Sequence, residues 1–196
     1  NEAYLNCEYL TLNRQGGVLS LGKNRGDEAQ RDIFMGTYVM KTELFIEMIQ
    51  KARAISSMYT LSQVVSLSCD ELDIRGYAHE GYFAAITDLK SYYNANMALL
   101  NIDDAEELIN EEWPIYTRTN DSCPTQYYAD ANVKQSVISN GCFIKGTVEN
   151  SIIGRGCTIE EGVVIKNSVV LPDTYIAKDI VLDYQVVDKH SKLLHC

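Results

Sequence analysis

Histidines and cysteines are the residues of this chain that could do chemistry at neutral pH. A histidine could act as a general base, and the three present are His79, His190 and His195. The six cysteines form no C-x-x-C pair and have no histidine at metal-ligand spacing, which disfavours zinc and redox sites. They are Cys7, Cys69, Cys123, Cys142, Cys157 and Cys196. We expect reduced thiols in a cytoplasmic protein, with Cys142 and Cys157 packed in a core.

A six-residue phrase recurs three times in the second half of the chain. Val133–Ile138 returns as Val148–Ile153 and as Ile165–Val170, so the copies start 15 and 17 residues apart. Within the last two copies apolar residues recur every six positions, which is typical of hexapeptide coils. Three six-residue faces, about 18 residues, complete one coil of a parallel β-helix. An antiparallel sheet is the alternative, but two-residue hairpin signals are scarce, Asn140-Gly141 being the exception.

The excess of acidic residues limits the kinds of partner that the chain can bind. Seventeen Lys and Arg stand against 27 Asp and Glu, giving a formal net charge of -10. This charge argues against nucleic acid or an anionic membrane as partner. We also expect no secretory signal and no membrane span, because no apolar run approaches the roughly 18 residues that a span needs.

Residues 1–100 mix strand-like and helix-like segments. The predicted strands are Tyr9–Leu12, Val18–Leu21, Phe34–Met40, Leu72–Ala78 and Tyr82–Ala85. The predicted helices are Thr42–Ala54, Met58–Leu67, Thr87–Leu100 and a short acidic one in Asp103–Asn110. Thr42 and Asp88 are the candidate caps. We therefore predict an α/β domain over residues 1–100, a linker over 101–124 and a β-helix domain over 125–196.

Four phrases, taken in order along the chain, match a known family. They are Met35–Val39, Glu80–Phe83, Ser91–Asn96 and Trp113–Thr117, and the hexapeptide coil follows them. Together they resemble glucose-1-phosphate adenylyltransferase, also called ADP-glucose pyrophosphorylase, which makes ADP-glucose and pyrophosphate from ATP and glucose 1-phosphate. The resemblance implies part of a Rossmann-like nucleotidyltransferase domain followed by a left-handed parallel β-helix. The family's Gly-rich phosphate loop has no match, so the sequence resembles a fragment that begins within that domain.

The resemblance shows a change at the family's metal-binding aspartate. Tyr82–Asp88 aligns with a Tyr-Trp-x-Asp-Val-Gly-Thr phrase whose aspartate helps to hold Mg²⁺, and Ala85 stands at that aspartate. Mg²⁺ needs oxygen ligands, and a methyl group offers none. Asp88 lies too far along to replace the aspartate and is better explained as a helix cap. We expect no metal or other cofactor in this chain, with Mg²⁺ held by a catalytic partner.

The family's sugar-phosphate pocket is changed as well. Relatives carry an Ala-Ser-Met-Gly-x-Tyr phrase whose serine lies in the pocket, and Phe34 stands at this serine. A bulky ring there would fill the pocket. By the resemblance, Lys23, Tyr38 and Glu80 are remnants of substrate binding.

These departures favour a subunit that has lost the chemistry. The pattern is similar to the GlgD-type subunit of Gram-positive bacteria, which implies a regulatory role in glycogen biosynthesis within a homo- or hetero-tetramer containing a catalytic paralogue. Two alternatives stay open. One is an active nucleotidyltransferase with another metal ligand. The other is a hexapeptide acyltransferase, whose general base would be a histidine on the coil, whereas no histidine is expected inside the well-formed repeat here.

The β-helix is expected to serve assembly rather than chemistry. Tyr175, Ile176, Ile180 and Val181 lie where the six-residue pattern loosens. We predict that they form an outer surface buried by another subunit. The alternative is that they fill the last coils.

Overall fold

The chain consists of two compact units. The computed structural model describes residues 4–26, 30–55, 60–109, 114–116 and 121–195. Its backbone contacts divide the chain into Asn1–Glu80 and Gly81–Cys196. Residues 81–100, which the sequence prediction placed in the α/β domain, therefore group with the second unit. None of the helices in these described ranges is long and apolar enough to cross a membrane.

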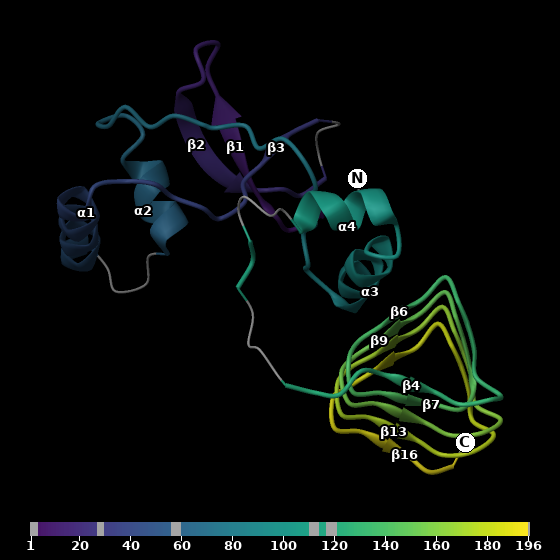
Figure 1. Cartoon of the computed structure of the whole chain (residues 1–196). Helices are drawn as coiled ribbons and strands as arrows, with labels where there is room; N and C mark the ends of the chain where they lie inside the picture. Colours follow the sequence, from purple (N-terminus) through teal and green to yellow (C-terminus); the bar gives the residue numbers. More distant parts are fainter. Residues whose placement is uncertain (1–3, 27–29, 56–59, 110–113, 117–120, 196) are drawn as a thin grey trace. The chain divides into compact units, whose positions relative to one another are not determined.

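The first unit is a small antiparallel sheet with two helices (Figure 1). Its strands, in the order β2-β1-β3, are β1 (Glu8–Leu12), β2 (Val18–Lys23) and β3 (Asp32–Ile33). The helices are α1 (Thr42–Ile55) and α2 (Leu61–Leu67). Met48 of α1 packs with Val64 and Val65 of α2 in a buried cluster. The amphipathic pattern of α1 thus buries its apolar stripe against α2, as expected for a surface helix.

Three predicted strands are wrong. Phe34–Met40 and Tyr82–Ala85 have irregular backbone, although Asp32–Ile33 just before the first of them does pair with β1. Leu72–Ala78 keeps only an isolated antiparallel bridge, between Arg75 and Gly17. Apolar side chains of Phe34–Met40 and Leu72–Ala78 pack instead against the helical cluster; they are Tyr38, Met40, Leu72 and Ile74. Helix packing therefore buries the alternating apolar residues without a strand ladder, because β-propensity reflects half-burial more than a backbone preference.

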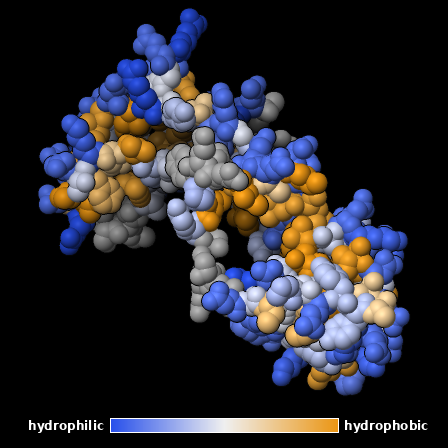
Figure 2. Space-filling view, viewed as in Figure 1, coloured by the Kyte–Doolittle hydropathy of each residue, from blue (hydrophilic) through white to orange (hydrophobic). Residues whose placement is uncertain are grey.

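The predicted helices are confirmed, with shifted ends. α1 begins at Thr42, which is therefore its first residue rather than its cap. α2 begins only after Thr60, which forms a reciprocal capping box with Gln63, and Met58 lies outside the described residues. In the second unit, α3 (Leu89–Ala98) and α4 (Ile102–Leu108) precede the coil. Exposed apolar side chains gather over these two helices (Figure 2); they include Leu89, Ile102 and Ile109.

The rest of the second unit is a parallel β-solenoid of about four turns (Figure 1). One face stacks β4 (Gln126–Tyr127), β7 (Phe143–Ile144), β10 (Thr158–Ile159), β13 (Tyr175–Ile176) and β16 (Lys192–Leu193). The second stacks β5 (Asn132–Lys134), β8 (Thr147–Glu149), β11 (Val164–Lys166) and β14 (Val181–Asp183). The third stacks β6 (Val137–Ile138), β9 (Ile152–Ile153), β12 (Val169–Val170) and β15 (Val186–Val187). This arrangement confirms the hexapeptide β-helix.

Each copy of the recurring phrase turns its corner in the same way. Gln135, Asn150 and Asn167 have φ of 45°, 46° and 46°, in the left-handed region that Asn tolerates better than most residues. The serine after each of them stacks on the next: the Ser151 N–H donates to Ser136 Oγ at 3.1 Å, and the Ser168 N–H to Ser151 Oγ at 3.0 Å. These bonds satisfy backbone groups that burial would otherwise leave unpaired.

Candidate functional site

The region predicted to be the sugar-phosphate pocket follows β3 in the first unit. Phe34 and Tyr38 meet edge to face, with ring centroids 4.9 Å apart. The Phe34 N–H donates to the Glu8 carbonyl at 2.8 Å, which fixes the backbone beside β1. Both rings are half-buried. Phe34 therefore packs on the side of Tyr38, in a contact that a serine at this position could not make.

Two polar residues, Ser62 and Glu8, also interact with Tyr38. Ser62 Oγ donates to Glu8 Oε1 at 2.6 Å. Burial and the charge of Glu8 raise the pKa of Tyr38, whereas a hydrogen bond with Ser62 lowers it. Lys23 is the ladder partner of Glu8, so their side chains share one face of the sheet. Glu8 was missed by the sequence reasoning, because its link to Tyr38 spans distant parts of the chain.

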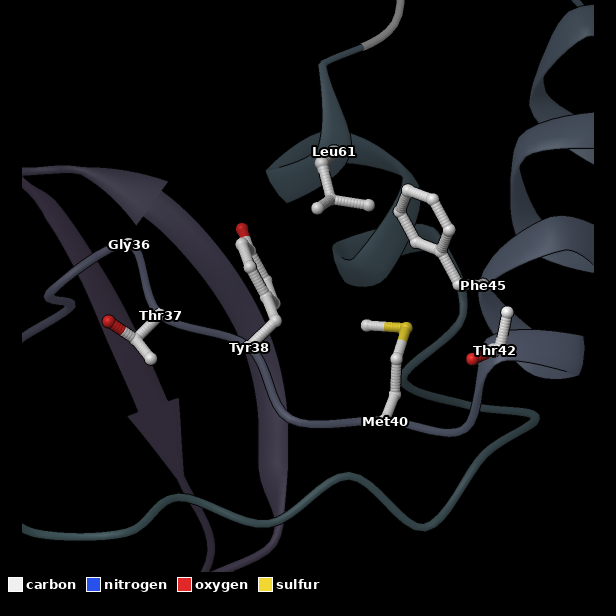
Figure 3. A pocket seen from close by; sticks show the side chains of 7 residues that line it. All are labelled: Gly36, Thr37, Tyr38, Met40, Thr42, Phe45 and Leu61. Atoms are coloured by element: carbon white, nitrogen blue, oxygen red, sulfur yellow. The ribbon is translucent and has the colours of Figure 1, made fainter.

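An open pocket of about 530 Å³ lies beside Tyr38 (Figure 3). Its lining residues are Gly36, Thr37, Tyr38, Met40, Thr42, Phe45 and Leu61. Figure 3 shows Met40, Phe45 and Leu61 converging on one side of the hollow, with the Tyr38 ring facing them. None of these lining residues carries a charge, so the lining offers no cation to neutralise a phosphate.

The remaining predicted site residues do not line this pocket. Lys23 and Glu80 belong to the first unit, where Glu80 is exposed near the division between the units. Ala85 belongs to the second unit, in the irregular segment that leads into α3, and is half-buried. Within one unit, the structure thus brings together Phe34 and Tyr38 and places Lys23 opposite Glu8.

Asp88, three residues after Ala85, is confirmed as the cap of α3. Its Oδ1 accepts the Ser91 N–H at 2.7 Å, and Ser91 Oγ accepts the Asp88 N–H at 2.9 Å. Hydrogen bonds from the Ser91 backbone and side chain to the carboxylate lower the pKa of Asp88. A methyl group at position 85 and a carboxylate occupied in capping do not fit Mg²⁺. In the part of the chain that the structure describes, no group of three or more His, Cys, Asp or Glu residues could hold a metal ion.

Comparison with known proteins supplies the family. A family model described as GlmU-like, C-terminal hexapeptide, matches residues 124–195. Over 157 residues, covering 78% of its length, the chain is 34% identical to three proteins named glucose-1-phosphate adenylyltransferase. They come from Bacillus thuringiensis (strain Al Hakam), Bacillus cereus (strain Q1) and Bacillus anthracis. The chain is a relative of the glucose-1-phosphate adenylyltransferases. It spans 42% of the length of these proteins.

In this relative of the glucose-1-phosphate adenylyltransferases, two of the four predicted interface residues lie inside the coil. Ile176 is 0% and Ile180 2% exposed, so the prediction that they form a surface is wrong and they fill the last coils. Ile176 of β13 and Ile180, just before β14, both belong to the buried core cluster of the solenoid. Tyr175 is half-buried, and Val181 is 63% exposed. An interface on this part of the solenoid stays a prediction for Tyr175 and Val181.

The cysteine and histidine predictions for the coil have different outcomes. Cys142 and Cys157 are buried in the solenoid core, as predicted. His190 lies beyond the well-formed sequence repeat, as predicted, but the solenoid continues there and places it in the last coil, between β15 and β16. Its Nδ1 is 3.6 Å from Asp173 Oδ2, and both side chains are exposed. The repeat at that point has lost its six-residue sequence pattern but keeps its backbone path, which is why the sequence did not show it.

Proposed function

We propose that this chain is part of a regulatory or scaffolding subunit of glucose-1-phosphate adenylyltransferase that does not perform the chemistry itself. It would act in the cytoplasm and support ADP-glucose synthesis by a catalytic partner, for glycogen formation. The observation that carries this proposal is the pair Ala85 and Asp88. One offers no oxygen, and the other is held in the α3 cap, so the segment lacks the aspartate that the aligned phrase of the family uses for the Mg²⁺ that neutralises phosphates during nucleotidyl transfer.

The packing around Tyr38 supports the same proposal. Phe34 packs edge to face on Tyr38, and the aligned phrase of the family has a serine at the Phe34 position. The pocket beside them is lined by apolar and hydroxyl side chains without a charge. A sugar phosphate bound there would have to lose hydration without gaining a charged partner, which is unfavourable.

A silent subunit can still change the activity of a partner. Contacts between subunits need not involve the reacting atoms, and a subunit that binds one conformation of its partner more tightly shifts the partner's equilibrium. The outward face of the solenoid near Val181 is the surface we assign to such a contact.

The test is to mix the full-length protein with the catalytic partner and to measure ADP-glucose formation and its effector response. We expect the mixture to differ from the partner alone, and the two proteins to elute together on sizing. Val181→Glu should weaken the complex, whereas the control Val137→Glu, on an exposed position of another face, should leave it intact. A mixture that behaves as the partner alone would overturn the proposal.

The competing function is an active nucleotidyltransferase with a different metal ligand, which the names of the 34% identical relatives favour. If that function is correct, the full-length protein alone will form ADP-glucose, and Ala85→Asp will change its rate little. An acyltransferase is favoured only by His190 facing Asp173. If that pair acts as a base, His190→Ala will abolish acyl transfer from an acyl thioester to an amine or hydroxyl acceptor.

A further inference from the structure

Tyr184 breaks the pattern of the solenoid corner. The equivalent residues of the preceding coils are Gln135, Asn150 and Asn167, and Tyr184 takes the same left-handed conformation with φ of 53°. A bulky side chain is strained there, whereas Asn is tolerated. The ring of Tyr184 is 69% exposed, so burial in the coil core does not offset the strain. A strained residue of this kind calls for a contact that explains it.

The contact that Tyr184 makes is with α3. Its ring lies 6.4 Å from the ring of Tyr93, centroid to centroid, at an interplanar angle of 47°. The Tyr93 hydroxyl also donates to the backbone carbonyl of Asn167 at 2.7 Å. One side chain of α3 therefore touches the left-handed corners of two successive coils.

The solenoid face beneath α3 shows that the helix is seated on it. Val169 of β12 occupies an outward position. It pairs with Ile152 of the preceding coil, which in turn pairs with Val137 of β6, so Val169 and Val137 occupy equivalent positions. Val137 is 45% exposed, but Val169 is only 1% exposed. α3 packs against β12 and covers this side chain. Burial raises the pKa of Tyr93, as do Tyr184 and Asp183, so its hydroxyl stays protonated as a donor at neutral pH.

We propose that Tyr93, Tyr184 and the Asn167 carbonyl form a latch that holds α3 on the solenoid and thereby positions the segment carrying Ala85. Asp88 caps α3, so residues 81–88 immediately precede the helix that the latch holds in place. The solenoid would then fix the segment aligned with the family's metal-binding phrase. Tyr93 and Tyr184 are positioning residues in this scheme. The latch does not depend on whether the full-length protein is catalytic.

The test is amide hydrogen exchange of the intact chain, read separately for α3, residues 81–88 and the solenoid. Tyr93→Phe keeps the ring but removes one hydrogen bond, so α3 should exchange roughly three- to tenfold faster. Tyr184→Asn removes the ring contact and should speed α3 by a similar factor, roughly three- to tenfold. The same variant restores the residue type of the corner, so the solenoid itself should exchange no faster than in the native chain.

Tyr92→Phe is the matched control, because Tyr92 lies on the same helix and its backbone carbonyl, rather than its hydroxyl, accepts a hydrogen bond from Asn96. This control should leave α3 unchanged. The double variant Tyr93→Phe with Tyr184→Asn should show less than the product of the single effects, as residues in contact do. Native exchange rates of α3 in both single variants would overturn the latch. Faster exchange of the solenoid in Tyr184→Asn would do so too, because Tyr184 would then support the coil rather than α3.

Discussion

The solenoid and the first unit differ in how their side chains are held. In the solenoid a stack of apolar residues fills the interior, and Ile144, Ile153, Ile159 and Ile165 are each 0% exposed. In the first unit the helical cluster has three buried members, while Val39 and Tyr77 are almost fully exposed. The solenoid is built from one repeated local solution, whereas the first unit depends on contacts between distant segments. Stability should therefore reside mainly in the solenoid, and sequence change should be tolerated more readily in the first unit.

The largest effect is expected from a substitution that leaves a cavity in the solenoid core. Ile159→Ala removes a fully buried side chain from a closely packed stack and should cost about 2–5 kcal/mol of unfolding free energy. Denaturant titration followed by hydrogen exchange should show the loss in the solenoid peptides. Met48→Ala is the matched change in the first unit and should lower protection of α1 and α2 alone. Equal loss in both units from either variant would contradict the comparison.

The next effect concerns the polar ladder of the corner. Ser168 Oγ accepts the Gln185 N–H at 3.0 Å and donates to the Lys166 carbonyl, and Ser168 is buried. Ser168→Ala leaves the Gln185 N–H without its acceptor, whereas the Lys166 carbonyl still accepts the Tyr184 N–H, and the change should cost about 1–3 kcal/mol. Ser136→Ala, at the half-buried start of the ladder, should cost less. Thermal unfolding of the two variants measures both costs, and no loss of stability in either variant would show that the ladder is dispensable.

A smaller effect is expected at a turn of the first unit. Gly36 has φ of 72°, and a Cβ there would meet nothing within 4 Å. Gly36→Ala should therefore cost only the left-handed strain, about 1–2 kcal/mol. Denaturant unfolding monitored at α1 measures this cost. A much larger loss would mean that the backbone beside Tyr38 tolerates less sequence change than we expect of the first unit.

The smallest effect is the response of α3 to acid. The folded-state pKa of Asp88 is lowered, mainly by its hydrogen bonds from Ser91, so its contribution is present above the unfolded pKa and is lost as pH falls through the folded value. Protection of α3 should decline below about pH 4, near the ordinary aspartate value. Exchange measured across this range should show no such decline in Asp88→Asn. An identical decline in both forms would place the acid response elsewhere.

The sequence predicted the parts of the structure that local rules determine. The six-residue spacing of apolar residues, the α1 stripe and the Asp88 cap all depend on neighbours within a few positions, and each is confirmed. The strand predicted at Phe34–Met40 failed because its apolar residues meet helices from elsewhere in the chain. Inward and outward positions in the last coils were confused because the pattern weakens there, as Ile176 shows.

The candidate site was predictable only where a residue type alone decides the chemistry. A methyl group at position 85 cannot bind a metal, whatever surrounds it. The contact of Phe34 with Tyr38, the role of Glu8 and the Tyr93 latch all join segments far apart in the sequence. One sequence signal could have indicated the latch. Tyr184 stands at a corner where the preceding coils have Gln or Asn.

The central claim is that this chain belongs to a subunit without nucleotidyl transfer activity of its own. The most direct measurement is the rate at which the full-length protein alone, free of any partner, forms ADP-glucose from ATP and glucose 1-phosphate with and without Mg²⁺. We predict a rate indistinguishable from that without protein, at every Mg²⁺ concentration. Turnover that depends on Mg²⁺ and reaches an ordinary enzyme rate, about 1 s⁻¹ or more, would contradict the claim.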